Sequence, residues 1–241
     1  MDNTEFTNRT FQRFGNWRTF ESLIDILKHK SRFIIPEPYK SFVDSAIANV
    51  RGELTTVVPS NTILYRARIN EINFEDREKE KIPFPPENMR HPPIQLAKPG
   101  RINPEGIPYL YCAGDPDTAG SELRPWKGAH LTIAEIKMNN DLDIADLTTD
   151  CENELWDVFF DELSLSFSTQ WPPELKLNYL IPQFFSEHFK AVGLRGVKYR
   201  SEFNVGGDNY ALFYGEDYSI VNTYCMETIS VDFCFFQNKP V

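Results

Sequence analysis

The sequence is poor in cysteine and histidine, with four of each among its 241 residues, and neither type is grouped. They are Cys112, Cys151, Cys225, Cys234, His29, His91, His130 and His188. No CxxC pair or other zinc-ligand spacing occurs among them, which disfavours a structural metal site. Scattered thiols of this kind are typical of reduced cysteines, so we expect a cytoplasmic protein that binds no metal.

Positive charge and long apolar runs are also scarce. Lysine and arginine number 25 against 35 acidic residues, which gives a net charge of −10. Nucleic-acid binding needs a positive face to neutralise phosphates, so this balance disfavours it. The first residues, 1–5, have neither the basic nor the apolar region of a secretory signal. No run approaches the ~18 apolar residues of a membrane span, so we expect no membrane partner.

The chain does have the composition of a folded protein. Hydrophobic residues make up 41% and include 19 Phe and 10 Tyr, which excludes a chain that is disordered throughout. Its length is sufficient for one well-buried core. Apolar residues recur at helical spacing at 20–27 and 39–50, with Pro36 and Pro38 between them. We therefore predict a helical N-terminal segment, 1–55, followed by a main domain, 56–241.

Within the main domain, strand and helix patterns are mixed. The patterns predict strands at 62–68, 109–113, 130–138, 142–147, 196–201 and 210–214, with one or two more within 218–236. They predict helices at 115–123, 152–168 and 174–192, the last interrupted by Pro182. Prolines recur from Pro83 to Pro108, which predicts a long loop between the first two strands. The fold class that follows is α+β.

Several residues in this framework are candidates for chemistry. Arg66 lies in an otherwise apolar strand, where it reaches the rim, forms an ion pair or binds an anion, because an unpaired buried guanidinium is costly. Glu122 lies in the predicted short helix, where a solvated surface glutamate is the simplest interpretation. Ser201 ends a strand before a Gly-Gly turn, and it caps the turn or faces a cleft. No G-x-S-x-G elbow surrounds any serine, which disfavours serine-hydrolase chemistry.

The order of these features is more specific than any one of them. A strand Leu-Tyr-Arg is followed by Gly-Arg-Ile-Asn-Pro-Glu-Gly-Ile-Pro-Tyr-Leu-Tyr at 100–111, then by Glu122, Gly-x-x-Tyr-x-Ser at 196–201 and Gly-Gly-x-Asn at 206–209. This order resembles the RES-domain family over about residues 60–220. The family is named for a characteristic Arg, Glu and Ser. The resemblance implies an ADP-ribosyltransferase-like fold of mixed, mainly antiparallel sheets with flanking helices.

The resemblance also implies a site. Its implied catalytic residues are Arg66, Tyr111, Glu122 and Ser201. Its implied substrate-binding residues are Tyr65, Arg101, Asn103, Gln183 and Asn209. The two departures from the compact family pattern are the N-terminal segment and the long insert between Arg66 and Gly100.

RES proteins commonly act as toxins of bacterial toxin–antitoxin pairs, and members consume NAD⁺ by cleaving its nicotinamide–ribose bond. The resemblance therefore implies NAD⁺ as substrate and an antitoxin as a candidate protein partner. The acceptor stays open: water gives a glycohydrolase, phosphate a phosphorylase, and a protein side chain a mono-ADP-ribosyltransferase. A non-catalytic binding module with the same fold is a further alternative. A homo-oligomer is also left open, because apolar surface on 1–55 suits a second copy as well as an antitoxin.

Overall fold

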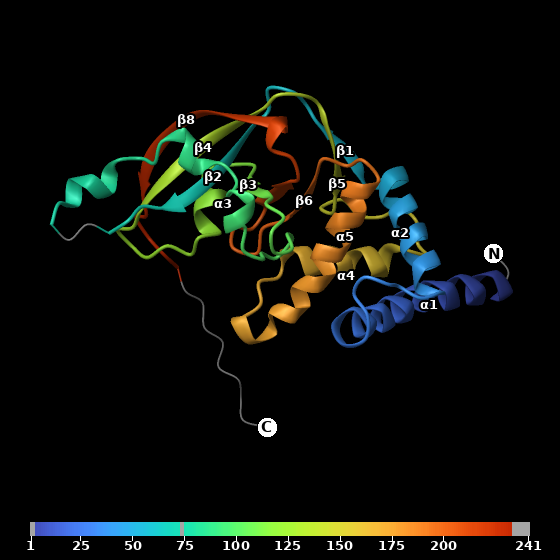
Figure 1. The fold of residues 1–241 in the computed structure, drawn as a ribbon. Helices are drawn as coiled ribbons and strands as arrows, with labels where there is room; N and C mark the ends of the chain where they lie inside the picture. Colours follow the sequence, from blue (N-terminus) through green and yellow to red (C-terminus); the bar gives the residue numbers. More distant parts are fainter. Residues whose placement is uncertain (1–2, 73–74, 233–241) are drawn as a thin grey trace.

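The structure is a computed structural model that describes residues 3–72 and 75–232, with the backbone alone for 3–15. An eight-stranded sheet forms its centre, with helices packed against it (Figure 1). The strands are β1 Thr55–Val58, β2 Ile63–Ile69, β3 Leu110–Ala113, β4 His130–Met138, β5 Leu142–Asp146, β6 Gly196–Arg200, β7 Asp208–Leu212 and β8 Tyr218–Glu227. Their order across the sheet is β1-β5-β6-β7-β3-β2-β4-β8. Only β5 and β6 pair in parallel among the described strands, so the predicted mixed, mainly antiparallel fold is confirmed.

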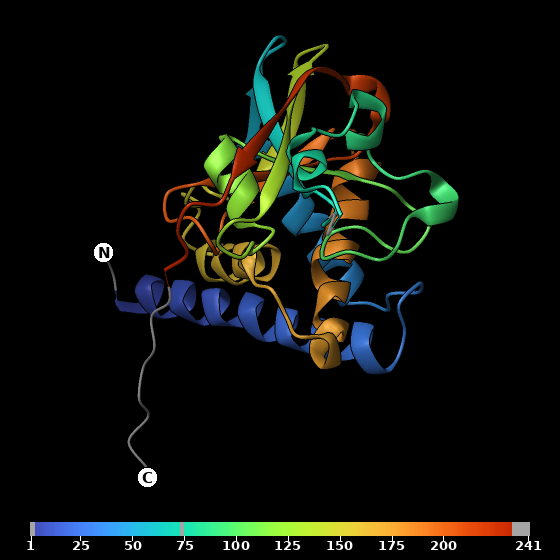
Figure 2. The same ribbon diagram turned by 90° about the vertical axis from the view of Figure 1, so that its left-hand side faces the viewer.

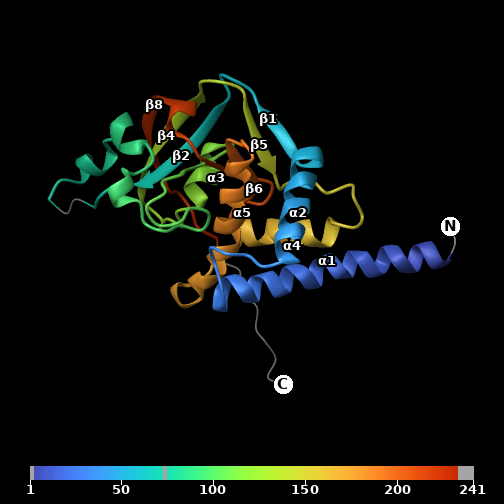
Figure 3. The ribbon, with the colours of Figure 1, turned by 45° about the vertical axis from the view of Figure 1, so that its right-hand side comes forward.

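Most helices gather at the β1–β6 end of the sheet, whereas the short helix that follows β3 packs on β2, β3 and β4. They are α1 Asn3–His29, α2 Tyr39–Glu53, α3 Pro116–Ser121, α4 Asp157–Ser168 and α5 Leu180–Ala191. Helix α4 lies along α1, as the view in Figure 2 shows. The N-terminal part of α1 extends beyond the rest of the molecule (Figure 3). The helical N-terminal segment that the sequence predicts is therefore present.

An aromatic core joins these helices to the sheet. The ring of Phe20 on α1 meets Phe159 on α4 edge to face, with centroids 5.0 Å apart. Phe42 on α2 stacks on Trp156 at 5.3 Å. Aromatic pairs in these geometries add stability beyond the area they bury. The N-terminal helices thus share one hydrophobic cluster with α4, α5 and strand β6.

The sheet opens between β2 and β3 at its centre. Tyr65 and Ala113 are the only register pair recorded between these two described strands, whereas β2 pairs with β4 along its whole length. Ala113 is the last residue of β3, and no further pair with β2 is recorded along the rest of that described strand. The sheet consists of two halves that meet at a narrow junction, and the predicted site residues lie on both sides of it.

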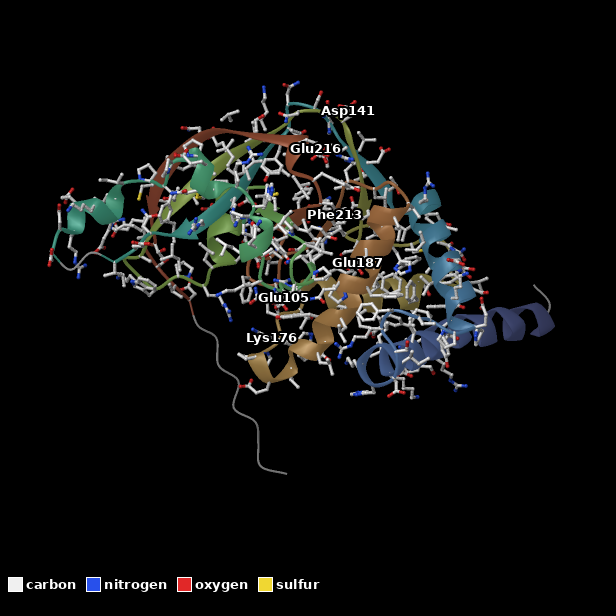
Figure 4. The ribbon with its side chains drawn as sticks, in the orientation of Figure 1. Glu105, Asp141, Lys176, Glu187, Phe213 and Glu216 are labelled. Atoms are coloured by element: carbon white, nitrogen blue, oxygen red, sulfur yellow. The ribbon has the colours of Figure 1, made fainter. Side chains whose placement is uncertain are left out.

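The segment between β2 and β3 has the irregular structure that its prolines predict. It contains the short 3₁₀ turns η1 Arg77–Lys81, η2 Pro86–Met89 and η3 Ile94–Leu96. A buried amide anchors its start: Asn70 donates to the carbonyl of Glu80 at 2.6 Å and accepts from the hydroxyl of Thr132. Its far part, 100–108, returns beside α5; Figure 4 marks it by Glu105.

Several predicted boundaries are wrong for local reasons. Pro182 does not interrupt a helix, because it lies in the first turn of α5, where a backbone N–H has no intrahelical partner. The preceding 3₁₀ turn η4 Pro173–Tyr179 is separate. Helix α4 begins at Asp157 rather than at 152, because the Asn153 side chain accepts from Leu155 N and makes a turn first.

Two further differences concern strands. Strand β1 was not predicted, because its four residues follow α2 directly and are too few to show a period. The C-terminal pattern yields one described strand, β8, and residues 233–236 of that prediction lie outside the described residues, as does Cys234.

No described helix is long and apolar enough to cross a bilayer.

Candidate active site

Glu122 occupies the end of α3, not its interior as the sequence predicts. The helix begins as expected, with the Asp115 side chain accepting from Thr118 N at 2.8 Å and Pro116 in the first turn. It ends at Ser121, so Glu122 is its C-cap residue. Its side chain is 20% exposed, which places the carboxylate against the protein and not in solvent.

Four side chains from different parts of the chain donate to this carboxylate. Oε1 accepts from Ser201 Oγ at 2.8 Å and from Asn209 Nδ2 at 2.6 Å. Oε2 faces Arg101 Nη2 at 3.5 Å and Gln170 Nε2 at 3.4 Å. The interactions at Oε1 are short and those at Oε2 are long, so Oε1 is the more firmly held oxygen.

Ser201 caps its turn, which is one of the two functions that the sequence left open, and it also contacts Glu122. It follows β6, and its Oγ accepts from Phe203 N at 3.2 Å and Asn204 N at 3.1 Å, which caps the turn toward β7. The same hydroxyl donates its proton to Glu122. Asn209, on β7 next to β6, is 2% exposed.

Tyr111 fastens the loop at 100–103 to the sheet. Its hydroxyl donates to Asn103 Oδ1 at 2.8 Å and accepts from Ile102 N at 3.0 Å and Asn103 N at 3.2 Å. Burial raises the pKa of Tyr111 to about 12, so the phenol is a neutral donor at ordinary pH. From α5, Gln183 Nε2 donates to Gly100 O at 2.7 Å. Three predicted substrate-binding or catalytic residues, Tyr111, Asn103 and Gln183, therefore shape one loop.

Glycine at position 100 is required by this packing. A Cβ there would lie 2.3 Å from Asn103 Oδ1 and 2.7 Å from the Tyr111 hydroxyl, closer than real contacts allow. The close approach of this backbone to Tyr111 explains why the Gly-Arg-x-Asn pattern precedes a strand that carries a tyrosine.

Arg101 projects from this loop toward Glu122 and α4. Its Nη1 donates to the carbonyl of Phe167 at 2.8 Å and to that of Ser168. Its guanidinium lies over the ring of Tyr199, 5.5 Å from the centroid, and only 10% of the side chain is exposed. These contacts hold Arg101 inside the protein.

Arg66 lies on the other face of the sheet from these groups. Tyr65 and Ala113 are register partners and share the face of Asn209, so the intervening Arg66 points to the opposite side. Its Nη1 reaches the carbonyl of Tyr111 at 3.5 Å across the opening between β2 and β3.

The guanidinium of Arg66 is incompletely satisfied. Within the described chain its Nε is buried without a hydrogen-bond partner. Burial lowers the pKa of Arg66, and the described groups that act on it electrostatically include no carboxylate. Of the three interpretations that the sequence left open, these contacts do not show the ion pair, and the unpartnered Nε fits an anion.

The structure thus brings most predicted residues together. Ser201, Asn209 and Arg101 each contact Glu122, and Tyr111, Asn103 and Gln183 join them through the 100–103 loop. Arg66 lies on the other face of the sheet and reaches the Tyr111 carbonyl. The contacts that link these residues are those of Glu122 with Ser201, Asn209, Arg101 and Gln170, of Tyr111 with Asn103, of Gln183 with Gly100 and of Arg66 with Tyr111. Tyr65 instead packs with Ala67 and Ala113 in a small apolar cluster.

Gln170 is the contact residue that sequence analysis missed. It stands two residues after the end of α4, in a stretch with no motif around it. Its backbone N–H donates to Glu202 Oε2 at 2.8 Å, one residue beyond Ser201. Only the folded chain brings these positions together, so no spacing signal marks it.

No group of three or more His, Cys, Asp or Glu suited to a metal occurs in the part of the chain that the structure describes. The polar groups of the site are donors around one carboxylate, and its cations are arginines. Arg66, with its unpartnered Nε, is the cation among them that could hold an anionic group.

Comparison with known sequences decides the family. The RES domain matches residues 65–231. The chain belongs to the RES-domain family. The matched region contains Tyr111, Glu122 and Ser201 and begins one residue before Arg66, whereas α1, α2 and β1 lie outside it.

Among solved structures, a chain of the M. tuberculosis MbcT-MbcA toxin–antitoxin complex is 13% identical to this RES-domain protein, with a TM-score of 0.43. The match covers 76% of this chain and 92% of that chain. No curated protein sequence matches the chain.

Proposed function

We propose that this RES-domain protein consumes NAD⁺ by cleaving the bond between nicotinamide and ribose. The observation that carries the proposal is the Glu122 carboxylate, which accepts from Ser201 and Asn209 and faces two further donors at its second oxygen. Fixed in this way, a carboxylate needs no reorganisation when positive charge develops near it.

The reaction produces such a charge. When nicotinamide leaves as a neutral base, the ribose C1′ becomes oxocarbenium-like. Glu122 stabilises this centre or orients the ribose hydroxyls, and Ser201 orients Glu122 and the substrate. Tyr111 and the 100–103 loop form one wall of the site, and the ring of Tyr111 offers a face for nicotinamide.

Arg66 is our candidate for the pyrophosphate. Its Nε is buried and unpartnered, and its side chain lies on the face of the sheet opposite Glu122, so a pyrophosphate bound to it would have to reach across the opening between β2 and β3. Arginine binds phosphate oxygens through paired donors, so an anion here would satisfy the group that the protein leaves unsatisfied. Tyr65, Asn103, Gln183 and Asn209 complete the proposed substrate-binding set.

The biological role that we propose is that of a cytoplasmic toxin, with an antitoxin as partner. It is supported by membership of the RES-domain family and by the resemblance of the site motifs to those of its toxins. The acceptor that receives the ribosyl group is a separate question, since water, phosphate and a protein side chain all use the same bond cleavage.

Product analysis tests the proposal. Purified full-length protein is incubated with NAD⁺ labelled in the adenylate part, with and without inorganic phosphate. We expect free nicotinamide in every case, together with ADP-ribose or its phosphate. Label transferred to protein would instead identify a mono-ADP-ribosyltransferase, and intact NAD⁺ would contradict the enzyme and favour a binding module.

A further inference from the structure

The C-terminal end of α4 receives its cation from outside the helix. Its last turn contains no basic residue of its own. The last carbonyls of a helix lack intrahelical partners, and a positive group near them is favourable. Arg101 fills this position, with Nη1 donating to Phe167 O and Ser168 O.

The same guanidinium faces Glu122 with its other terminal nitrogen, Nη2, at 3.5 Å. Its plane is also covered by the ring of Tyr199, which is 2% exposed. The contacts of Arg101 are thus with the protein itself. This differs from Arg66, whose Nε is buried without a partner among the described residues.

From this contrast we propose that Arg101 is a positioning residue that fixes Glu122 to the end of α4, not a contact for the substrate pyrophosphate. The inference rests on the proposed function. Arg101 holds Glu122 Oε2 in place, while Ser201 and Asn209 hold Oε1. The carboxylate is thereby oriented from both sides.

Gln170 also links the end of α4 to Glu122. It lies just beyond α4, and its Nε2 donates to Glu122 Oε2 at 3.4 Å. A shift of the C-terminal end of α4 therefore moves both donors of Oε2 together. The geometry of Glu122 depends on where α4 ends.

Helix α4 is held in turn by the N-terminal segment that lies outside the family match. Asn16 Nδ2 on α1 donates to Leu155 O at 2.7 Å, just before α4 begins. Phe20 packs on Phe159 within it. Helices α1 and α2 therefore stabilise the position of α4. Because α4 contacts Arg101, they also stabilise the position of the Glu122 carboxylate.

Steady-state kinetics of full-length variants test the inference. We expect Arg101→Gln to lower kcat for NAD⁺ consumption by about 10²-fold, as small misplacements of reacting groups do, with KM changed less than about twofold. Arg101→Lys keeps the charge but loses the planar fork, so we expect a smaller loss of kcat. The matched control is Arg66→Lys, which we expect to raise KM. A rise in KM for Arg101→Gln, or an unchanged kcat, would overturn the inference.

A second readout does not need turnover. Amide hydrogen exchange over 165–171 is expected to speed up in Arg101→Gln relative to wild type, because two helix-end carbonyls lose their donor. Unchanged exchange there would overturn the inference. If wild type leaves NAD⁺ intact, the proposed function fails while this measurement still decides the link between Arg101 and α4.

A third measurement covers the case in which neither Arg101 variant folds. The guanidinium protons of Arg101 in the wild-type protein are then followed by NMR. Slow exchange with water is expected, and exchange as fast as that of an exposed arginine would overturn the inference.

Discussion

Ser201 Oγ donates a 2.8 Å hydrogen bond to Glu122 Oε1, although the two residues are 79 positions apart in the chain. Ser201 reaches this position from the end of β6, and Glu122 reaches it from the end of α3. The contact joins two of the three residue types for which the family is named.

Asn209→Asp is expected to destabilise the folded protein, because a second carboxylate would stand where an amide now donates to Glu122 Oε1 at 2.6 Å. Two carboxylates at this distance cannot both be ionised cheaply. The loss should shrink as pH falls from 7 toward 5, since one of the pair then takes up a proton. Thermal unfolding across this range checks the prediction, and a variant whose melting temperature matches wild type at pH 7 would contradict it.

Gly100→Ala is expected to reduce stability by about 1–3 kcal/mol, because the added methyl would overlap Asn103 Oδ1 and the Tyr111 hydroxyl. Gly52→Ala, in helix α2, is the matched control: nothing lies within 4 Å of its added Cβ. There we expect a gain of about 0.5–1 kcal/mol. Urea unfolding of both variants measures the difference, and equal effects at the two positions would refute the packing of the loop.

Stability is expected to fall as pH rises from about 9 to 12. Burial raises the pKa of Tyr111 to about 12 and that of Cys112 to about 12, so the folded state keeps protons that the unfolded chain releases earlier. The stabilising contribution is complete below the unfolded pKa and is lost as pH passes through the folded value. Tyr111→Phe should flatten this decline, and denaturant unfolding at pH 9, 10 and 11 measures it. A decline as steep in Tyr111→Phe as in wild type would show that Tyr111 is not responsible.

The sequence was sufficient to predict most strands and the start of α3, because each depends on local pattern or capping chemistry, whereas the mainly antiparallel pairing followed from the family resemblance. Asp115 and Pro116 mark a helix start by their own side chains. The end of that helix was not predictable from composition, and the difference of two residues makes Glu122 a cap residue that faces the protein. Pro182 misled because a proline in a first turn and one in a helix interior look alike in sequence.

The site residues were predicted from the order of the motifs along the chain, and not from the chemistry of any single residue. Arg66, Glu122 and Ser201 each had a simpler structural interpretation. The register between paired strands cannot be read from the sequence. The face of β2 on which Arg66 lies depends on the pairing of Tyr65 with Ala113. Gln170 could not be found either, because a glutamine after a helix has no pattern of its own. The different roles that we propose for Arg66 and Arg101 likewise depend on contacts that only tertiary packing creates.

The most direct test of the account compares NAD⁺ consumption by wild type, Glu122→Gln and Glu105→Gln. Glutamine keeps the size of the side chain and removes the charge, and Glu105 is an exposed glutamate on the loop beside the site. Loss of one group that stabilises developing charge typically costs about 10²–10³ in rate, so we predict that loss for Glu122→Gln and wild-type turnover for Glu105→Gln. A folded Glu122→Gln protein that consumes NAD⁺ as fast as wild type would contradict the central claim that this carboxylate drives the reaction.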